Sequence, residues 1–123
     1  MKIEYKIFLY DTKGDGWNNN TLSIITENNT ILDNISLEYN DIIDGINCKS
    51  YNFSIDKKYE KFIIIYNDNG YYSHENYYKL YQNKNLIYES PFGETPKKKI
   101  ELVNYQESSK KLFKTQGNPP PPP

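Results

Sequence analysis

The sequence predicts an all-β domain, an antiparallel β-sandwich of the jelly-roll or immunoglobulin type with about eight short strands. Two features of composition and one of pattern support this prediction. The chain holds 15 Ile and 13 Tyr, which favour strands, and it has no Ala, the best helix former. Short runs of alternating apolar and polar residues are separated by turn-forming residues at intervals of roughly 8–12 residues. A length of 123 residues suits one such domain.

The first strand is predicted from strict alternation. Residues 3, 5, 7 and 9 are apolar and share one face, whereas residues 2, 4 and 6 are charged and share the other. The alternation stops at Asp11. Residues 11–20 contain Gly14, Gly16 and three consecutive Asn, a composition that predicts a loop.

Seven further strands follow from similar patterns. Their expected ranges are 21–26, 30–37, 51–55, 62–66, 77–82, 85–89 and 99–103. The continuous apolar run 62–66 predicts a central strand that is buried on both faces. Residues 38–47 are mostly polar and predict a connection, in which Ile42, Ile43 and Ile46 could pack inward. Residues 67–75, rich in Asn, Gly and Tyr, predict a second loop.

The composition changes after Asn104 and predicts a boundary there. Residues 1–104 form the sandwich domain, and residues 105–123 form a flexible polar tail that ends in five prolines. Consecutive prolines favour the polyproline II conformation. Either the tail is a linker without a fold, or it contacts a polyproline-binding partner.

Several classes of function are disfavoured. The net charge is −1 and there is no Arg, so nucleic-acid binding is not expected. No apolar run approaches the ~20 residues that span a bilayer, and the charged, alternating N-terminus is not a signal peptide, so membrane insertion is not expected either. The sequence has one cysteine, Cys48, and one histidine, His74, which argues against a disulfide framework and against a His-based metal site. No catalytic motif is present, and we expect the protein not to be an enzyme.

The loop 11–20 is the most informative stretch. Asp11, Asp15, Asn18 and Asn20 offer carboxylate and amide oxygens, which are the ligands that calcium prefers, and the glycines let a short loop converge them. The loop is not a helix-loop-helix calcium motif, because Lys13 and Leu22 stand where that motif has ligands. The alternative is a Gly-Asp-Gly turn whose Asp side chains accept hydrogen bonds from nearby backbone amides.

This loop also carries a resemblance. Asp11-x-x-Gly14-Asp15-Gly16-Trp17-Asn18-x-Asn20-x-Leu22 resembles the "DxxGDGWNGN" signature of a small β-sandwich module. The module occurs in secreted and surface proteins of algae, protists and bacteria and in giant-virus proteins. The segment 65–70 followed by Ser73-His74-Glu75 is similar to a second, weaker feature of that module. The chain departs from the signature at Lys13 and Asn19.

The resemblance implies an adhesive or structural role and a bound calcium ion. On this interpretation Asp11 and Asp15 are the charged ligands, and Asn18 or Asn20 adds a side-chain carbonyl. Glu75 is the best carboxylate from the second loop, and Asp68 is the next.

Aromatic residues beside the second loop suggest a binding surface. Tyr71, Tyr72 and Tyr78 are candidates for ligand contact, with Trp17 as a further one, although Trp17 is better explained as a lid or core anchor. Alternation places Tyr77 and Tyr81 on one face of their strand and Tyr78 on the other. The alternative for all of these rings is that they fill a small core.

Two functions remain from different classes. The first is a non-enzymatic structural or adhesive module, stabilised by calcium, that binds other structural proteins at a virion or cell surface; a virion component of a giant virus is the context we expect. The second is a calcium-dependent, lectin-like domain that binds surface glycans.

Overall fold

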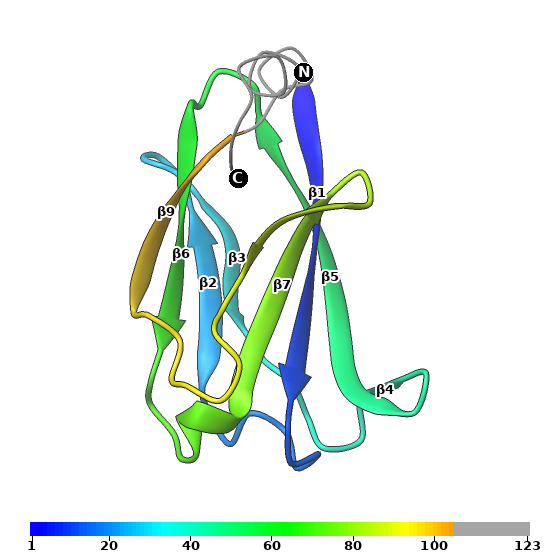
Figure 1. Ribbon diagram of the computed structural model, residues 1–123. Coiled ribbons are helices and arrows are strands. Elements are labelled where there is room, and N and C mark those ends of the chain that lie inside the picture. Colours follow the sequence, from blue (N-terminus) through cyan, green and yellow to red (C-terminus); the bar gives the residue numbers. More distant parts are fainter. Residues whose placement is uncertain (105–123) are drawn as a thin grey trace, which may run out of the picture.

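The structure is a computed structural model that describes residues 1–104. In that range two antiparallel sheets pack against each other (Figure 1), which confirms the predicted all-β sandwich. The expected tail with its five prolines lies outside the described residues. No helix in the described part is long and apolar enough to span a membrane.

The described residues form nine strands and one short 3-10 helix. In chain order they are β1 (Lys2–Asp11), β2 (Thr21–Ile25), β3 (Thr30–Ile35), β4 (Ile42–Ile43), β5 (Ile46–Asp56), β6 (Lys61–Asn67), η1 (Ser73–Glu75), β7 (Asn76–Gln82), β8 (Asn85–Glu89) and β9 (Lys99–Val103). One sheet has the order β4-β5-β1-β7-β8 and the other the order β3-β2-β6-β9.

The long strand β1 organises the five-stranded sheet. It pairs with β5 on one side, with Tyr5 opposite Phe53, and with β7 on the other, with Asp11 opposite Asn76. β1 therefore ends beside the start of β7. This register brings the loop after β1 to the same end of the sandwich as η1, as Figure 1 shows.

The core lies between the sheets and follows the period of two along each strand. In β1 the inward residues are the ones that alternation predicts, and Ile7 and Leu9 have no exposed surface. Tyr5 stacks on Phe53 with ring centroids 5.2 Å apart. Each such side chain contributes about 1.5–3 kcal/mol when fully buried, so a core of aromatic and branched residues stabilises a small domain.

One expected connection is wrong. Residues 38–47 contain the short strand β4 and the beginning of β5, joined through Asp44 and Gly45, both with positive φ (52° and 78°). Ile42 and Ile46 flank this tight turn and are more than half exposed. Figure 1 shows β4 and the adjoining turn projecting sideways from the sandwich, so these two side chains do not pack inward, whereas Ile43 is half-buried.

The expectation for the run 62–66 is also partly wrong. β6 lies inside its sheet, between β2 and β9, as predicted. However, only Phe62, Ile64 and Tyr66 are buried, whereas Ile63 and Ile65 are half-buried on the outer face. A sandwich covers one face of each sheet, so an unbroken apolar run does not prove burial of both faces.

Candidate metal centre

The two loops that the sequence singles out meet at one end of the sandwich. The Thr12 amide donates to the Glu75 carbonyl at 2.9 Å, and the Tyr71 amide donates to the Asn18 carbonyl at 3.2 Å. The loops are packed so closely that a Cβ atom on Gly70 would lie 1.7 Å from the Asn18 carbonyl oxygen. Only glycine fits at this contact.

The first loop is closed by its own carboxylate. Asp11 Oδ2 accepts a hydrogen bond of 2.6 Å from the Asp15 amide, and Oδ1 accepts a longer one of 3.4 Å from Lys13. Asp side chains favour such local bonds, which bend the chain back on itself. Gly16 has a φ of 88°, and a Cβ there would lie 2.8 Å from the Leu37 carbonyl oxygen. The glycine therefore permits both the conformation and the close approach.

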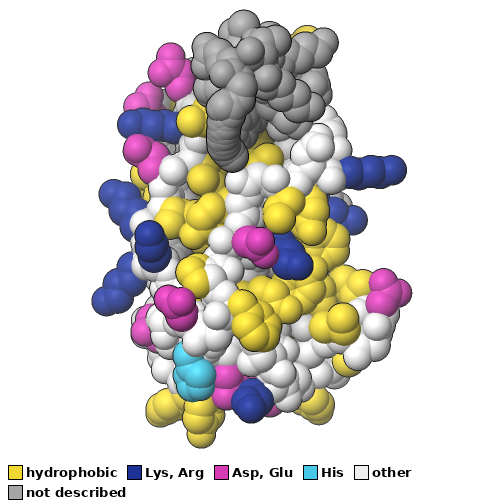
Figure 2. All heavy atoms as spheres, viewed as in Figure 1, with side chains coloured by type: hydrophobic (Ala, Val, Ile, Leu, Met, Phe, Trp, Pro, Cys, Tyr) yellow, Lys and Arg dark blue, Asp and Glu magenta, His cyan; other side chains and the backbone are white. Residues whose placement is uncertain are grey.

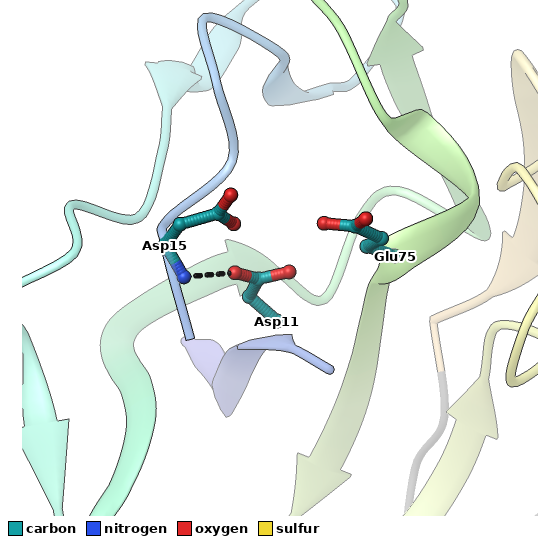
Figure 3. A group of neighbouring side chains, drawn as sticks. All are labelled: Asp11, Asp15 and Glu75. Carbon is teal, nitrogen blue, oxygen red and sulfur yellow. Dashed lines mark hydrogen bonds between the residues drawn. The ribbon is translucent and has the colours of Figure 1, made fainter. Parts of the chain in front are cut away.

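Three carboxylates converge between the loops. Asp11, Asp15 and Glu75 each offer an oxygen atom, and these atoms lie within 4.8 Å of one another. Figure 3 shows the carboxyl groups of Asp11 and Asp15 on one side and that of Glu75 facing them from η1. Asp11 and Glu75 are buried, and Asp15 is exposed. The cluster is thus anchored in the protein and open to solvent at Asp15.

Glu75 leaves one oxygen without a partner. The residue is 8% exposed, and its Oε1 atom is buried and accepts no hydrogen bond. The Nε2 atom of the exposed His74 lies 3.9 Å from the other oxygen. A buried carboxylate oxygen without a hydrogen bond is costly. A cation or a hydrogen-bond donor at this oxygen would offset that cost.

The electrostatics of Asp11 agree with this interpretation. Burial is the main factor that raises the pKa of Asp11, from 3.8 to about 6, and the neighbouring Asp15 carboxyl raises it further. The backbone amides of Asp15 and Lys13 act in the opposite direction but are weaker. Carboxylates this close repel each other when both are charged. A bound cation would remove this repulsion.

The donor set fits a hard cation. Three carboxylates supply only oxygen, without a thiolate or imidazole, which suits calcium better than zinc or copper. Calcium takes six to eight oxygens at ~2.3–2.6 Å, and three carboxylates can supply up to six of them. Asp11, Asp15 and Glu75 would hold the ion, whose charge would link the two loops.

Other predicted ligands lie elsewhere. Asp68 is exposed and is not part of the carboxylate cluster. Asn20 is fully buried, and its amide is used in the fold: Nδ2 donates to the Trp17 and Tyr71 carbonyls, and Oδ1 accepts from the Gly70 amide. Asn20 therefore connects the two loops, and its side-chain oxygen is already used by the Gly70 amide.

Asn18 is the other amide residue that the sequence predicts as a ligand. Its Oδ1 atom is buried and has no hydrogen-bond partner. Asn18 and Asp15 line a cavity of about 280 Å³, together with Ser36, Glu38 and the exposed Tyr39. Asn18 lies beside the carboxylate cluster, but the cluster itself is formed by the three acidic residues.

Trp17 is a core anchor, the explanation that the sequence favours, and the ligand contact expected for Tyr78 is excluded by its burial. Trp17 has no exposed surface; its indole N–H donates to the Tyr10 carbonyl at 2.7 Å, and its ring meets the edge of Tyr66. Tyr78 is equally buried, because it faces the core of the sandwich. Neither ring can stack on a ligand. Tyr71 and Tyr72 are exposed, at 71% and 58%, and their rings lie 6.4 Å apart.

Sequence reasoning missed one residue that supports the site. Asn47, at the start of β5, accepts a hydrogen bond from the Gly16 amide at 3.0 Å and donates to the carbonyls of Glu38 and Asp41. It holds the first loop against the chain before β5. An Asn in a polar segment gives no sequence signal for this role, because turns also use Asn.

Comparisons with known proteins add no relative. The chain matches no protein-family model, no curated protein and no solved structure.

Proposed function

We propose that this protein is a non-enzymatic structural or adhesive module. A bound calcium ion joins its loops 11–20 and 67–75 at one end of the sandwich. The observation that carries the proposal is the buried, unpartnered Oε1 of Glu75, a residue whose carboxylate lies within 4.8 Å of those of Asp11 and Asp15. These residues come from the end of β1, the loop after it and η1. A cation between them would therefore cross-link segments that are far apart in the sequence.

The module is proposed to act by binding rather than by catalysis. The resemblance of Asp11–Leu22 to the β-sandwich signature supports a place at a virion or cell surface, with other structural proteins as partners. A virion component of a giant virus is the specific context we propose. Calcium would keep the loop end rigid and thus reduce the entropy lost when a partner binds there.

A thermal melt tests the calcium part. A ligand that binds only the folded state adds about 2.7 kcal/mol at a hundredfold excess over its dissociation constant, which raises the melting temperature of a domain of this size by several degrees. Magnesium at the same concentration is the control for ionic strength. Equal melting temperatures in calcium, magnesium and metal-free buffer would contradict the proposal.

A lectin-like function is the second candidate, and one observation favours it. Tyr71 and Tyr72 project into solvent beside the carboxylate cluster, and the Tyr71 amide is bonded to the Asn18 carbonyl. Exposed rings next to a cation and amide groups suit a sugar. A glycan array probed with calcium and with a chelator tests this candidate: calcium-dependent hits that disappear in Tyr71→Ala support it, and an array without hits contradicts it.

A further inference from the structure

The proposed metal centre does not account for a row of aromatic residues on the outside of the sandwich. On the outer face of the five-stranded sheet five aromatic rings form a continuous row, here called the aromatic strip. Successive ring centroids are 5.2, 4.7, 6.3 and 5.6 Å apart along the order Phe92, Tyr77, Tyr10, Phe8 and Tyr81. Figure 2 shows hydrophobic side chains gathered over the region where Figure 1 draws β7, β1 and β5.

The aromatic strip does not fill the core. Phe8 and Tyr10 alternate with the buried Ile7 and Leu9 along β1, so they project from the opposite face of the sheet. The four strand residues of the strip are half-buried by one another, and Phe92 is 71% exposed. Single exposed apolar residues are common, whereas a continuous exposed row indicates a binding surface.

A cavity lies at one end of the strip. Its volume is about 520 Å³, and its lining includes Phe8, Tyr10 and Tyr81 of the strip together with Tyr5. Polar side chains surround these rings, and most of them are hydrogen-bond donors: Lys6, Asn52, Asn83 and Lys84, with Glu4 as the one acidic group.

The ring geometry favours a particular kind of ligand. Tyr10 and Tyr77 stack on each other with an interplanar angle of 8°, and the Lys6 and Lys79 ammonium groups lie over the Phe8 and Tyr10 rings. Phe8, Tyr10 and Tyr77 therefore each have a ring face covered by a neighbour, which leaves less open ring surface for a flat sugar. A row of packed rings with donors beside it suits polyproline, whose pyrrolidine rings pack in aromatic grooves and whose backbone offers carbonyls but no N–H.

The chain carries such a segment within reach of the strip. The side chain of Asn104, the last described residue, is fixed by three hydrogen bonds. Its Oδ1 accepts from the Tyr5 hydroxyl, and its Nδ2 donates to the Asp56 and Tyr59 carbonyls. Fourteen residues, 105–118, separate Asn104 from the first of five prolines. At about 3.3 Å per residue they span up to ~46 Å, which exceeds the ~33 Å length of β1 plus the ~10 Å between packed sheets.

We propose that Pro119–Pro123 dock on the aromatic strip of the same molecule, at the cavity lined by Phe8, Tyr10 and Tyr81. The connecting residues make this contact intramolecular, with an effective concentration in the millimolar range. A contact that is weak between separate molecules is therefore populated within one. The strip shares no residue with the carboxylate cluster, so the docking is independent of calcium.

Amide NMR spectra of the full chain test this proposal. The wild type is compared with a variant that carries Pro119→Ser, Pro120→Ser, Pro121→Ser, Pro122→Ser and Pro123→Ser together. These changes lie outside residues 1–104, so a shift difference within that range reports an effect of the prolines on the sandwich. We expect shift differences at the amides of Phe8, Asn52, Tyr81 and Asn83, and none at Ile63 and Ile65 on the outer face of the other sheet. Adding Tyr81→Ser to both chains should remove the differences, whereas Tyr71→Ser should leave them.

Each other outcome overturns the proposal. Identical spectra of the two chains would show that the prolines do not contact the strip. Differences that grow with protein concentration, together with a dimer mass in sedimentation, would assign the strip to the prolines of a second copy. Shifts of the same amides by cellohexaose in the serine variant, without any effect of the prolines, would assign it to a glycan. The result expected from the proposal is the same with and without calcium.

Discussion

The backbone amide of Thr12 donates to the carbonyl oxygen of Glu75 at 2.9 Å. This bond fixes the residue after Asp11 against the residue that bears the third carboxylate of the cluster. Two positions 64 residues apart, Asp11 and Glu75, are thereby held close by the backbone, independently of any ion. The candidate site is for this reason preorganised, which lowers the cost of binding a cation.

The Glu75 carboxylate is expected to destabilise the metal-free protein and to bind calcium, and Glu75→Gln tests both effects. We predict that Glu75→Gln raises the melting temperature in metal-free buffer, because the amide relieves repulsion and can donate to the Asp11 or Asp15 carboxylate. The same change should abolish the stabilisation by calcium. Asp68→Asn is the matched control, since Asp68 is exposed and lies outside the cluster. A calcium response that survives Glu75→Gln would exclude Glu75 as a ligand.

The raised pKa of Asp11 predicts a pH dependence of stability without metal. The native state holds the Asp11 proton more tightly than the unfolded chain, with a pKa of about 6 against 3.8. The corresponding stabilisation is complete below pH ~4 and is lost as the pH rises through about 6. With calcium the trend should reverse, since the ion binds the deprotonated carboxylates. Melts from pH 4 to 7 in both conditions measure this, and Asp11→Asn should flatten the metal-free profile. A metal-free profile that rises across this window in the wild type alone would contradict the assignment.

Two glycines should respond very differently to alanine. A Cβ at Gly70 would overlap the Asn18 carbonyl oxygen, so Gly70→Ala must separate the loops and should cost about 3 kcal/mol or more. Gly14 has open space but a φ of 79°, and Gly14→Ala should cost only about 1–2 kcal/mol. Chemical denaturation gives both values. Equal effects of the two substitutions would show that the loops do not pack as described.

Trp17 should behave as a core residue. Replacement by Ala should cost about 3–5 kcal/mol, because a fully buried ring is removed and the Tyr10 carbonyl loses its indole donor. It is the only Trp, so the emission maximum of the native protein should be blue-shifted and should not change when a glycan is added. A red emission maximum in the folded state would place the ring in solvent instead.

The sequence reveals some parts of this structure because single strands carry their own signal. The alternation in residues 3–9 predicts both the strand and its buried face, and the β7–β8 hairpin follows from apolar runs on either side of Asn83 and Lys84. The run 62–66 misleads, because five apolar residues in succession hide the period of two. The outer aromatic strip was detectable in principle, since Phe8 and Tyr10 continue the charged face of β1.

In the candidate site, too, the sequence predicts some residue roles and not others. Oxygen chemistry and loop composition predict Asp11 and Asp15, the resemblance adds Glu75, and the structure brings the three together. Asn20 looks equally suited in the sequence, but its side chain bonds the backbone, because a loop packed against another loop must satisfy its own buried amides and carbonyls. Such pairings depend on segments distant in the sequence, and no local pattern encodes them.

Direct titration with calcium tests the central claim most closely. Isothermal titration calorimetry of the wild type and of Asp15→Asn at pH 7 measures the number of sites and their affinity without relying on unfolding. Asp15 is the suitable position because it is exposed, so its amide variant should fold normally. The account predicts one site per chain in the wild type and a dissociation constant at least tenfold higher in the variant, equivalent to about 1.4 kcal/mol. Absence of binding by the wild type, or equal binding by the two proteins, would contradict it.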